Sequence, residues 1–549
     1  MKTLPKIVWM LALFADVNFI TLAADRKVAG PILDGLGNFQ FPISTESKLA
    51  QRYFNQGLML SYAFNHKEAV RSFRSVTMLD PDCAMGYWGI ANASGPHVNK
   101  PMDEQDNAQA WRALQQAITL AGNATPKERA MIEALGKRYQ EKYQEDRSAL
   151  DKAYAAALRD LTKKFPDDLD LQTVFAEALM DTMPWNYWLK DRSPKPETEE
   201  ALRALKFVLS RDPDHPGANH FYIHAVEAGP TPEAGLPSAD RLRNFAPHAG
   251  HLVHMPSHIY IRTGRFNDAV LANEKAVKAD REYLRQTRAQ GFYPGAYYPH
   301  NIHFLWWALM FEGRSKESLK RAKEAALYAT ENYCGPNKAV EAPRFRHLPW
   351  LTLMRFGRMN EILDVPKPAV TNDFLIDRAV WHFTRGLALV SQKDATAAIK
   401  EQAALALIAD SDDAKKLDSP QFPVASILAV AKHWLAGRVA EAQGDLEKAL
   451  NELRTAVELE DAIPYMEPAY WPLNVRPALG AVFLRSGKPE KAEEIFREDL
   501  KRMPRNGWGL LGLEKSLRAQ NRPEAADVVQ RQFNETWKNA DTELDVNWF

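Results

Sequence analysis

Apolar residues recur along the chain at the spacing of one face of a helix, and the alternation typical of half-buried strands is absent. Two segments share a longer pattern: a small residue, an Ala twelve positions later, a Phe four further on and a Pro eight after that. They consist of Gly57, Ala69, Phe73 and Pro81, and of Gly480, Ala492, Phe496 and Pro504. Small residues let two helix backbones approach, and Pro ends the second helix. The pattern predicts pairs of packed helices.

The first spacing recurs at three more places, which are Gly386 with Ala398, Gly437 with Ala449, and Ser257 with Ala269. Such matches are typical of tetratricopeptide repeats (TPR), whose helix pairs stack with a period of about 34 residues. Here the intervals from Gly386 to Gly437 and on to Gly480 are 51 and 43 residues, so additional segments are inserted. We therefore predict an all-α, TPR-like right-handed helical solenoid with aromatic- and Pro-rich inserted connections.

Three stretches rich in Pro and aromatic residues are the predicted insertions: residues 183–188, 291–299 and 465–472. Apolar rings in connecting segments usually pack back onto the scaffold. The segments would then either plug the superhelix, which is the commoner arrangement, or line a pocket for a small-molecule ligand.

Composition excludes several classes of protein. The chain has 549 residues with 70 Lys and Arg against 70 Asp and Glu, so it lacks the basic excess of a nucleic-acid binder. No phosphate-cradling glycine loop is present, so we expect no nucleotide cofactor. No low-complexity linker divides the chain. We predict one continuous solenoid with an N-terminal helical region at 25–210, a His-rich middle at 211–350 and C-terminal TPR repeats at 351–549.

The N-terminal residues resemble a secretory signal. Lys2 and Lys6 precede an apolar run at 7–15, and small residues follow before a charged stretch. Asp16 interrupts the apolar region, which disfavours a membrane-spanning helix. We predict a signal peptide at 1–24 and an exported product, periplasmic or secreted; the alternative is a frayed N-terminal helix of a soluble protein. No later segment is apolar enough for an integral membrane protein.

Two other groups carry weaker chemical signals. Glu177 and Asp181 lie one helical turn apart. They could be paired carboxylates for acid/base chemistry, but the interpretation we favour is a solvated helix edge. The only cysteines are Cys83 and Cys334, which allow at most one disulfide. Burial is the commoner reason for a cysteine at the position of Cys83.

Histidine is concentrated in one part of the chain. Nine of the 14 His lie between His215 and His303, where a uniform distribution would place about two. Most fall at helical spacing in three groups: His220, His224 and Glu227; His251, His254 and His258; and His300 with His303. Two imidazoles one turn apart can share a metal ion, and stacked helices can bring several such groups together. His215 and His248 lie beside Pro residues and are weaker candidates for metal ligands.

A metal site requires more than one helix, because side chains over seven residues of a straight helix diverge. Pro256 is also expected to break or kink the helix between His254 and His258. Imidazoles with a carboxylate suit copper, zinc or non-haem iron; Met255 and the predicted export favour copper slightly. Glu227 is the best candidate for a base or further ligand. The alternative is that each His is hydrogen-bonded to a carbonyl or carboxylate without any metal.

Six strings resemble a family of bacterial exported TPR proteins that has no established activity: Ala63–Ala69, Asp80–Met85, Ala218–Glu227, Ala249–Tyr260, Pro299–Phe304 and Pro504–Trp508. The resemblance implies a helical solenoid and assigns no catalytic residue. Two functional hypotheses follow. The first is an exported metalloprotein, with or without enzymatic activity. The second is a TPR scaffold that binds a protein or peptide on its concave face without metal.

Overall fold

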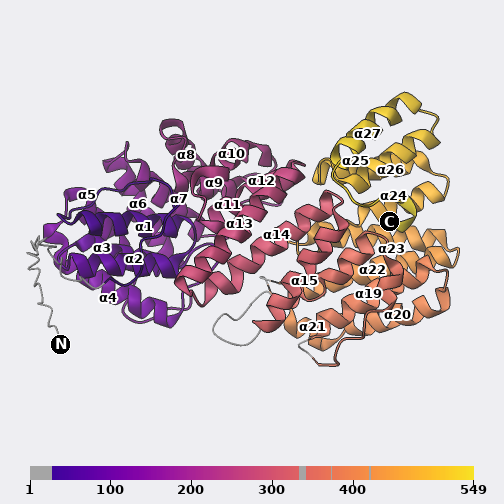
Figure 1. Cartoon of the computed structure of the whole chain (residues 1–549), viewed down its shortest axis with the longest axis horizontal. Coiled ribbons are helices and arrows are strands. Elements are labelled where there is room, and N and C mark those ends of the chain that lie inside the picture. Colours follow the sequence, from indigo (N-terminus) through magenta and orange to yellow (C-terminus); the bar gives the residue numbers. More distant parts are fainter. Residues whose placement is uncertain (1–27, 333–341, 372–373, 420–421) are drawn as a thin grey trace, which may run out of the picture.

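The computed structural model describes residues 28–332, 342–371, 374–419 and 422–549. The predicted signal peptide and Cys334 lie outside these ranges. Helices dominate the described residues, which form no β-strand and only isolated bridges such as His97 with Lys100. Figure 1 shows the helices following one another along an elongated molecule. The prediction of an all-α, TPR-like helical solenoid is confirmed.

The helices divide into three groups along the chain. The first group comprises α1 (Lys48–Tyr62), α2 (His66–Leu79), α3 (Ala84–Ala93), α4 (Glu104–Leu120), α5 (Pro126–Leu135), α6 (Ser148–Lys164), α7 (Leu169–Asp181) and α8 (Pro196–Arg211). The middle group comprises α9 (Pro216–Val226), α10 (Leu236–Phe245), α11 (Gly250–His254), α12 (Pro256–Arg262), α13 (Phe266–Thr287), α14 (Tyr298–Phe311) and α15 (Ser315–Glu331).

The last group comprises α16 (Ala342–Phe345), α17 (Leu348–Arg355), α18 (Met359–Leu363), α19 (Leu375–Ser391), α20 (Ala395–Ala409), α21 (Asp412–Leu417), α22 (Val424–Ala442), α23 (Leu446–Ala462), α24 (Arg476–Arg485), α25 (Pro489–Arg502), α26 (Gly507–Ala519) and α27 (Pro523–Thr536). Short 3-10 or π turns are η1 (Ala121–Asn123), η2 (Pro232–Gly235), η3 (Tyr293–Tyr297) and η5 (Val546–Trp548). Consecutive helices pack in pairs, among them α1 with α2, α14 with α15, α22 with α23 and α24 with α25.

The predicted glycine–phenylalanine register is the packing contact of two helix pairs. A Cβ atom on Gly57 of α1 would lie 2.6 Å from the ring of Phe73 on α2, and one on Gly89 of α3 would lie 2.4 Å from the same ring. Phe73 therefore fills a slot between two glycines sixteen positions away on either side. Phe496 is held in the same way between Gly480 and Gly512.

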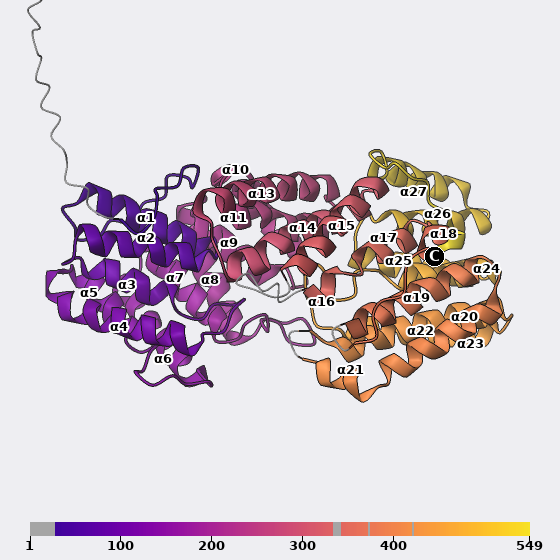
Figure 2. The same ribbon diagram turned by 60° about the horizontal axis from the view of Figure 1, so that its bottom comes forward.

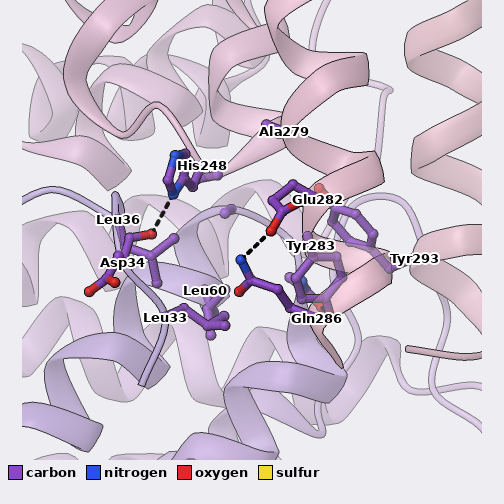
Figure 3. A pocket seen from close by; sticks show the side chains of 14 residues that line it. Leu33, Asp34, Leu36, Leu60, His248, Ala279, Glu282, Tyr283, Gln286 and Tyr293 are labelled. Atoms are coloured by element: carbon purple, nitrogen blue, oxygen red, sulfur yellow. Dashed lines mark hydrogen bonds between the residues drawn. The ribbon is translucent and has the colours of Figure 1, made fainter. Parts of the chain in front are cut away.

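An extended segment ties the N-terminal helices to the middle of the solenoid. Tyr53 of α1 donates a hydrogen bond to the carbonyl of Gly30 at 2.7 Å, and His248 donates through Nδ1 to the carbonyl of Asp34 at 2.9 Å. Figure 3 shows His248 and Asp34 facing each other beside Glu282 and Gln286 of α13. The cavity enclosed here is about 20 Å³, room for about one water molecule rather than an organic ligand.

The acidic pair on α7 is not a solvated edge, and that interpretation is wrong. Asp181 is buried and accepts a hydrogen bond from Arg138 Nη2 at 2.7 Å. Burial raises the pKa of both carboxyl groups; the charge of Asp181 raises that of Glu177 further, and the charge of Asp151 raises that of Asp181.

Cys83 is a buried free thiol at the N-terminus of α3, and burial raises its pKa to about 11. This agrees with its interpretation as a small buried residue. Across the described part of the chain, no helix combines the length and the apolar character that a membrane span requires.

The phenylalanine slot predicts a specific stability effect. In a Gly512→Ala variant, the new Cβ would lie 2.1 Å from the Phe496 ring, which Gly480 prevents from moving away. We expect the free energy of unfolding to fall by about 1–3 kcal/mol, as overpacking of a core usually costs. Thermal unfolding followed by circular dichroism measures the change. Gly122→Ala, where the added Cβ meets nothing within 4 Å, is the matched control and should leave the melting temperature unchanged.

Candidate metal centre

Six of the predicted histidines meet at the centre of the molecule. His220 and His224 lie on α9, His251 and His254 on α11, His258 on α12 and His300 on α14. Helix α12 contacts α9 and α11, and α11 contacts α14; Figure 2 shows α9, α11 and α14 between the N-terminal and C-terminal groups. Five of the six imidazoles are at most 2 % exposed, and His300 is partly exposed. The local excess of histidine in the sequence thus becomes one cluster in space.

The cluster consists of two trios. In the first trio, made of His220, His224 and His251, one nitrogen from each ring lies within 4.8 Å of the others. The second trio, made of His254, His258 and His300, meets the same criterion. The Nε2 atoms of His251 and His220 are 3.2 Å apart.

In the second trio, His254 Nε2 lies 2.9 Å from His258 Nε2 and 3.2 Å from His300 Nε2. Pro256 does not separate these rings, because Met255 keeps helical dihedral angles of φ −49° and ψ −37°. Its N–H still bonds to the carbonyl of His251 at 3.0 Å. The chain therefore continues as a helix from α11 into α12 with His254 and His258 on one face.

The hydrogen bonds at Nδ1 determine where the protons lie. His254 Nδ1 is 2.7 Å from Oδ1 of Asn273, and the amide orientation follows from Nδ2, which donates to the carbonyl of Ala269 at 2.8 Å. His258 Nδ1 is 2.6 Å from Oε2 of Glu227. An oxygen acceptor holds a proton on Nδ1, so in the neutral ring each Nε2 carries a lone pair. When both rings are neutral, two lone pairs face each other across 2.9 Å.

His220 and His224 are held in the same tautomer. His220 Nδ1 donates to the carbonyl of Tyr62 at 2.6 Å, and His224 Nδ1 donates to Oε1 of Glu227 at 2.6 Å. His224 Nε2 is buried without a hydrogen-bond partner among the described residues. Metal-binding histidines usually donate their second nitrogen to a carboxylate or carbonyl in this way.

Glu227, at the C-terminal end of α9, connects the two trios. Its two oxygens accept from His224 and His258, and Tyr465 donates a third hydrogen bond to Oε2 at 3.1 Å. Burial raises the pKa of Glu227, but the charge of His258 and the hydrogen bonds from both histidines outweigh this effect and hold it well below the usual range. Glu227 is therefore a carboxylate that orients imidazoles through their Nδ1 atoms.

The electrostatics keep most of the cluster neutral. Burial lowers the pKa of His220, His251, His254 and His300 well below the ordinary value, and neighbouring imidazoles lower it further. The neutral imidazole is the form that coordinates transition metals.

All three predicted insertions reach this cluster. Trp185 packs edge-on against His224 with ring centroids 5.2 Å apart, and Tyr297 packs on His251 at 4.6 Å. Tyr465 contacts Glu227, as described above. The insertions thus cover the histidines, which combines both arrangements considered for them: they fill the interior, and the third also borders a pocket.

One acidic residue at the cluster was missed from the sequence. Glu467 is buried, with Oε2 3.5 Å from His258 Nδ1, and forms a third group of close ligand atoms with Glu227 and His258. Burial and the charge of Glu227 raise its pKa well above the ordinary value. The one available signal was its position inside the predicted insertion 465–472, because its spacing to the histidines along the chain carries no periodicity.

His303 is not brought into either trio. Its ring stacks on Trp306 with centroids 5.3 Å apart and meets Phe345 edge-on at 4.9 Å. His215 and His248 also lie outside, as expected for residues with weaker claims. His215 accepts a hydrogen bond from the Ala218 N–H at the start of α9, and its Nε2 lies 3.2 Å from Asp170.

No family model and no curated protein matches the sequence. Among solved structures, the human IFIT1 dimer with m7Gppp-AAAA is 12% identical with a TM-score of 0.34, over 88% of this chain and 95% of that one. Yeast Tom70 is 14% identical with a TM-score of 0.31, over 88% and 90%. The TPR domain of P58(IPK) is 12% identical with a TM-score of 0.23, over 86% and 98%.

The buried neutral histidines predict acid sensitivity of the metal-free protein. Folding lowers their pKa, so the unfolded chain binds protons first as the pH falls below about 6.5, and stability decreases from there towards the lowered folded pKa. We expect chemical denaturation after chelation to give a lower free energy of unfolding at pH 5.5 than at pH 7.5. A His251→Phe variant should lose less over the same interval. An equal loss in both proteins would contradict the assignment for His251.

Proposed function

We propose that the chain is a transition-metal-binding repeat protein in which the two histidine trios each hold one ion. The observation that carries the proposal is the 2.9 Å approach of the Nε2 atoms of His254 and His258, whose lone pairs oppose each other when both rings are neutral. A cation bound by both nitrogens would relieve this repulsion. A single proton could be shared by two nitrogens, but His300 Nε2 also approaches His254, at 3.2 Å. Three converging nitrogens match a metal ion better than a proton.

Each trio offers three imidazole nitrogens as ligands, a set that suits copper, zinc or iron. Three protein ligands leave a further coordination position, as in catalytic rather than purely structural sites. His300 is the only partly exposed member of the six, so α14 marks the side from which an ion or a reactant reaches the centre. When bound, the metal would supply Lewis-acid or redox chemistry, and Glu227 would keep His224 and His258 oriented towards it.

The scaffold hypothesis is the second candidate, and the helical repeat architecture supports it. In that case the imidazoles would serve only as packing groups. Buried packing groups ordinarily satisfy their polar atoms, whereas His224 Nε2 and His251 Nδ1 have no partner among the described residues. We therefore place metal binding first. The predicted export of the chain remains a prediction and would give the protein access to extracytoplasmic metal.

Metal analysis of the purified full-length protein tests the proposal. We expect stoichiometric copper, zinc or iron by mass spectrometry of the elements, and strongly reduced content in a His254→Ala variant because the second trio loses its central ligand. His303→Phe, which keeps the ring on Trp306, is the matched control and should retain the metal. If the protein takes up none of these ions from added salts and its melting temperature is unchanged in chelator, metal binding is contradicted and the scaffold function takes its place.

Glu227 provides a second test. In a Glu227→Gln variant the amide has one oxygen for two Nδ1–H donors, so one imidazole loses its orientation. We expect metal affinity to fall about 10–100-fold, the usual effect of removing such a partner. Competition with a chromophoric chelator measures the affinity. Glu514→Gln, at another buried glutamate on α26, is the control. Equal affinities of both variants and the wild-type chain would argue against the role of Glu227.

A further inference from the structure

A pocket of about 160 Å³ lies under the connection between α23 and α24. Its wall combines aromatic rings with arginines and includes Arg262, Trp307, Glu467, Tyr470, Trp471 and Arg502. This volume compares with the roughly 150 Å³ cavity that accommodates benzene in an engineered protein core. The pocket therefore has room for a ligand with one small ring.

Three side chains of the wall have buried polar atoms without hydrogen-bond partners among the described residues: Arg262, Trp471 and Glu467, the last at both carboxyl oxygens. Arg262 Nε is buried, and its nearest carboxylate oxygen, on Glu467, is 4.0 Å away and beyond hydrogen-bond distance. Trp471 Nε1 is also buried and unpaired, on a side chain belonging to a residue only 4 % exposed. The groups of Arg262 and Trp471 are donors. Buried donors without partners are uncommon in native proteins, and a ligand that supplies acceptors would satisfy them.

The wall contains three arginines, Arg262, Arg476 and Arg502, and three carboxyl side chains, Glu460, Glu467 and Asp499, so the pairing of each arginine decides which of them is open to a ligand. Arg476 and Arg502 are both paired with Asp461, at 2.6 and 2.7 Å. Burial raises the pKa of Glu460 to about 8, so this wall carboxyl is largely protonated at neutral pH. Arg262 lies one helical turn after His258, and its carboxylate partner Glu467 is 4.0 Å away, farther than Asp461 is from the other two arginines. Its guanidinium is thus the wall cation with a donor left for a ligand.

We propose that this pocket binds a small aromatic carboxylate, with its carboxylate on Arg262 and its ring between Trp307, Tyr470 and Trp471. A guanidinium recognises a carboxylate through charge-assisted hydrogen bonds, and the indole N–H of Trp471 adds a further donor. Trp307 Nε1 already donates to the Pro472 carbonyl at 3.2 Å, so its ring faces contribute stacking area only. The inference is independent of metal binding, although Glu467 places the ligand beside His258.

Titration of the full-length protein with benzoate tests the inference, by calorimetry and by tryptophan fluorescence. We expect saturable binding of benzoate at one site, and binding at least tenfold weaker for benzyl alcohol, which has the same ring without the charge. An Arg262→Gln variant should bind benzoate at least tenfold more weakly. Arg502→Gln is the matched control, because this guanidinium lines the pocket but is paired with Asp461, and its affinity should change less than threefold.

Three results would overturn the inference: no saturable binding at millimolar benzoate, equal binding of benzyl alcohol, or unchanged affinity in Arg262→Gln. If Arg262→Gln melts at a lower temperature than the wild-type chain, Arg262→Lys keeps the charge and should bind with intermediate affinity. Each titration is run with chelator and with added metal. Binding of benzoate in chelator supports the pocket even if metal analysis fails, and the converse pattern supports the metal centre alone.

Discussion

The centre of this molecule depends on one constraint, which is the position of the protons on six closely packed imidazoles. An oxygen acceptor at Nδ1 places the proton on that side of the ring and turns the Nε2 lone pair inwards. Four rings are held in this protonation pattern, from three directions, by Asn273, Glu227 and the carbonyl of Tyr62. Helices α1, α9, α11, α12 and α13 must keep their relative positions for the pattern to exist.

Helical periodicity was sufficient to predict much of the cluster. Residues four positions apart share a face, so His220 with His224 and His254 with His258 were predictable from spacing alone. Pro256 suggested a break, but a helix tolerates proline at the start of a new turn, and Met255 stays helical. The Gly57 and Phe73 register was equally predictable, because a small residue opposite a large one describes a helix crossing directly.

Other features depended on how the solenoid curves. His303 is only three positions from His300, and the 60° difference in direction around α14 places it against Trp306 instead of the cluster. Glu467 and Tyr465 reach Glu227 only because the connection after α23 folds inwards, and nothing in local sequence specifies that path. The interval from Gly437 to Gly480 is longer than a standard repeat, which indicates an inserted connection but does not show where that connection packs.

The contact between Tyr465 and Glu227 joins residues 238 positions apart. Chains are made from the N-terminus, and their early parts fold first. All six imidazoles are therefore present, in an open half-solenoid, well before the segment that covers them exists. The contact that closes this side of the centre is therefore supplied by the last repeats of the chain.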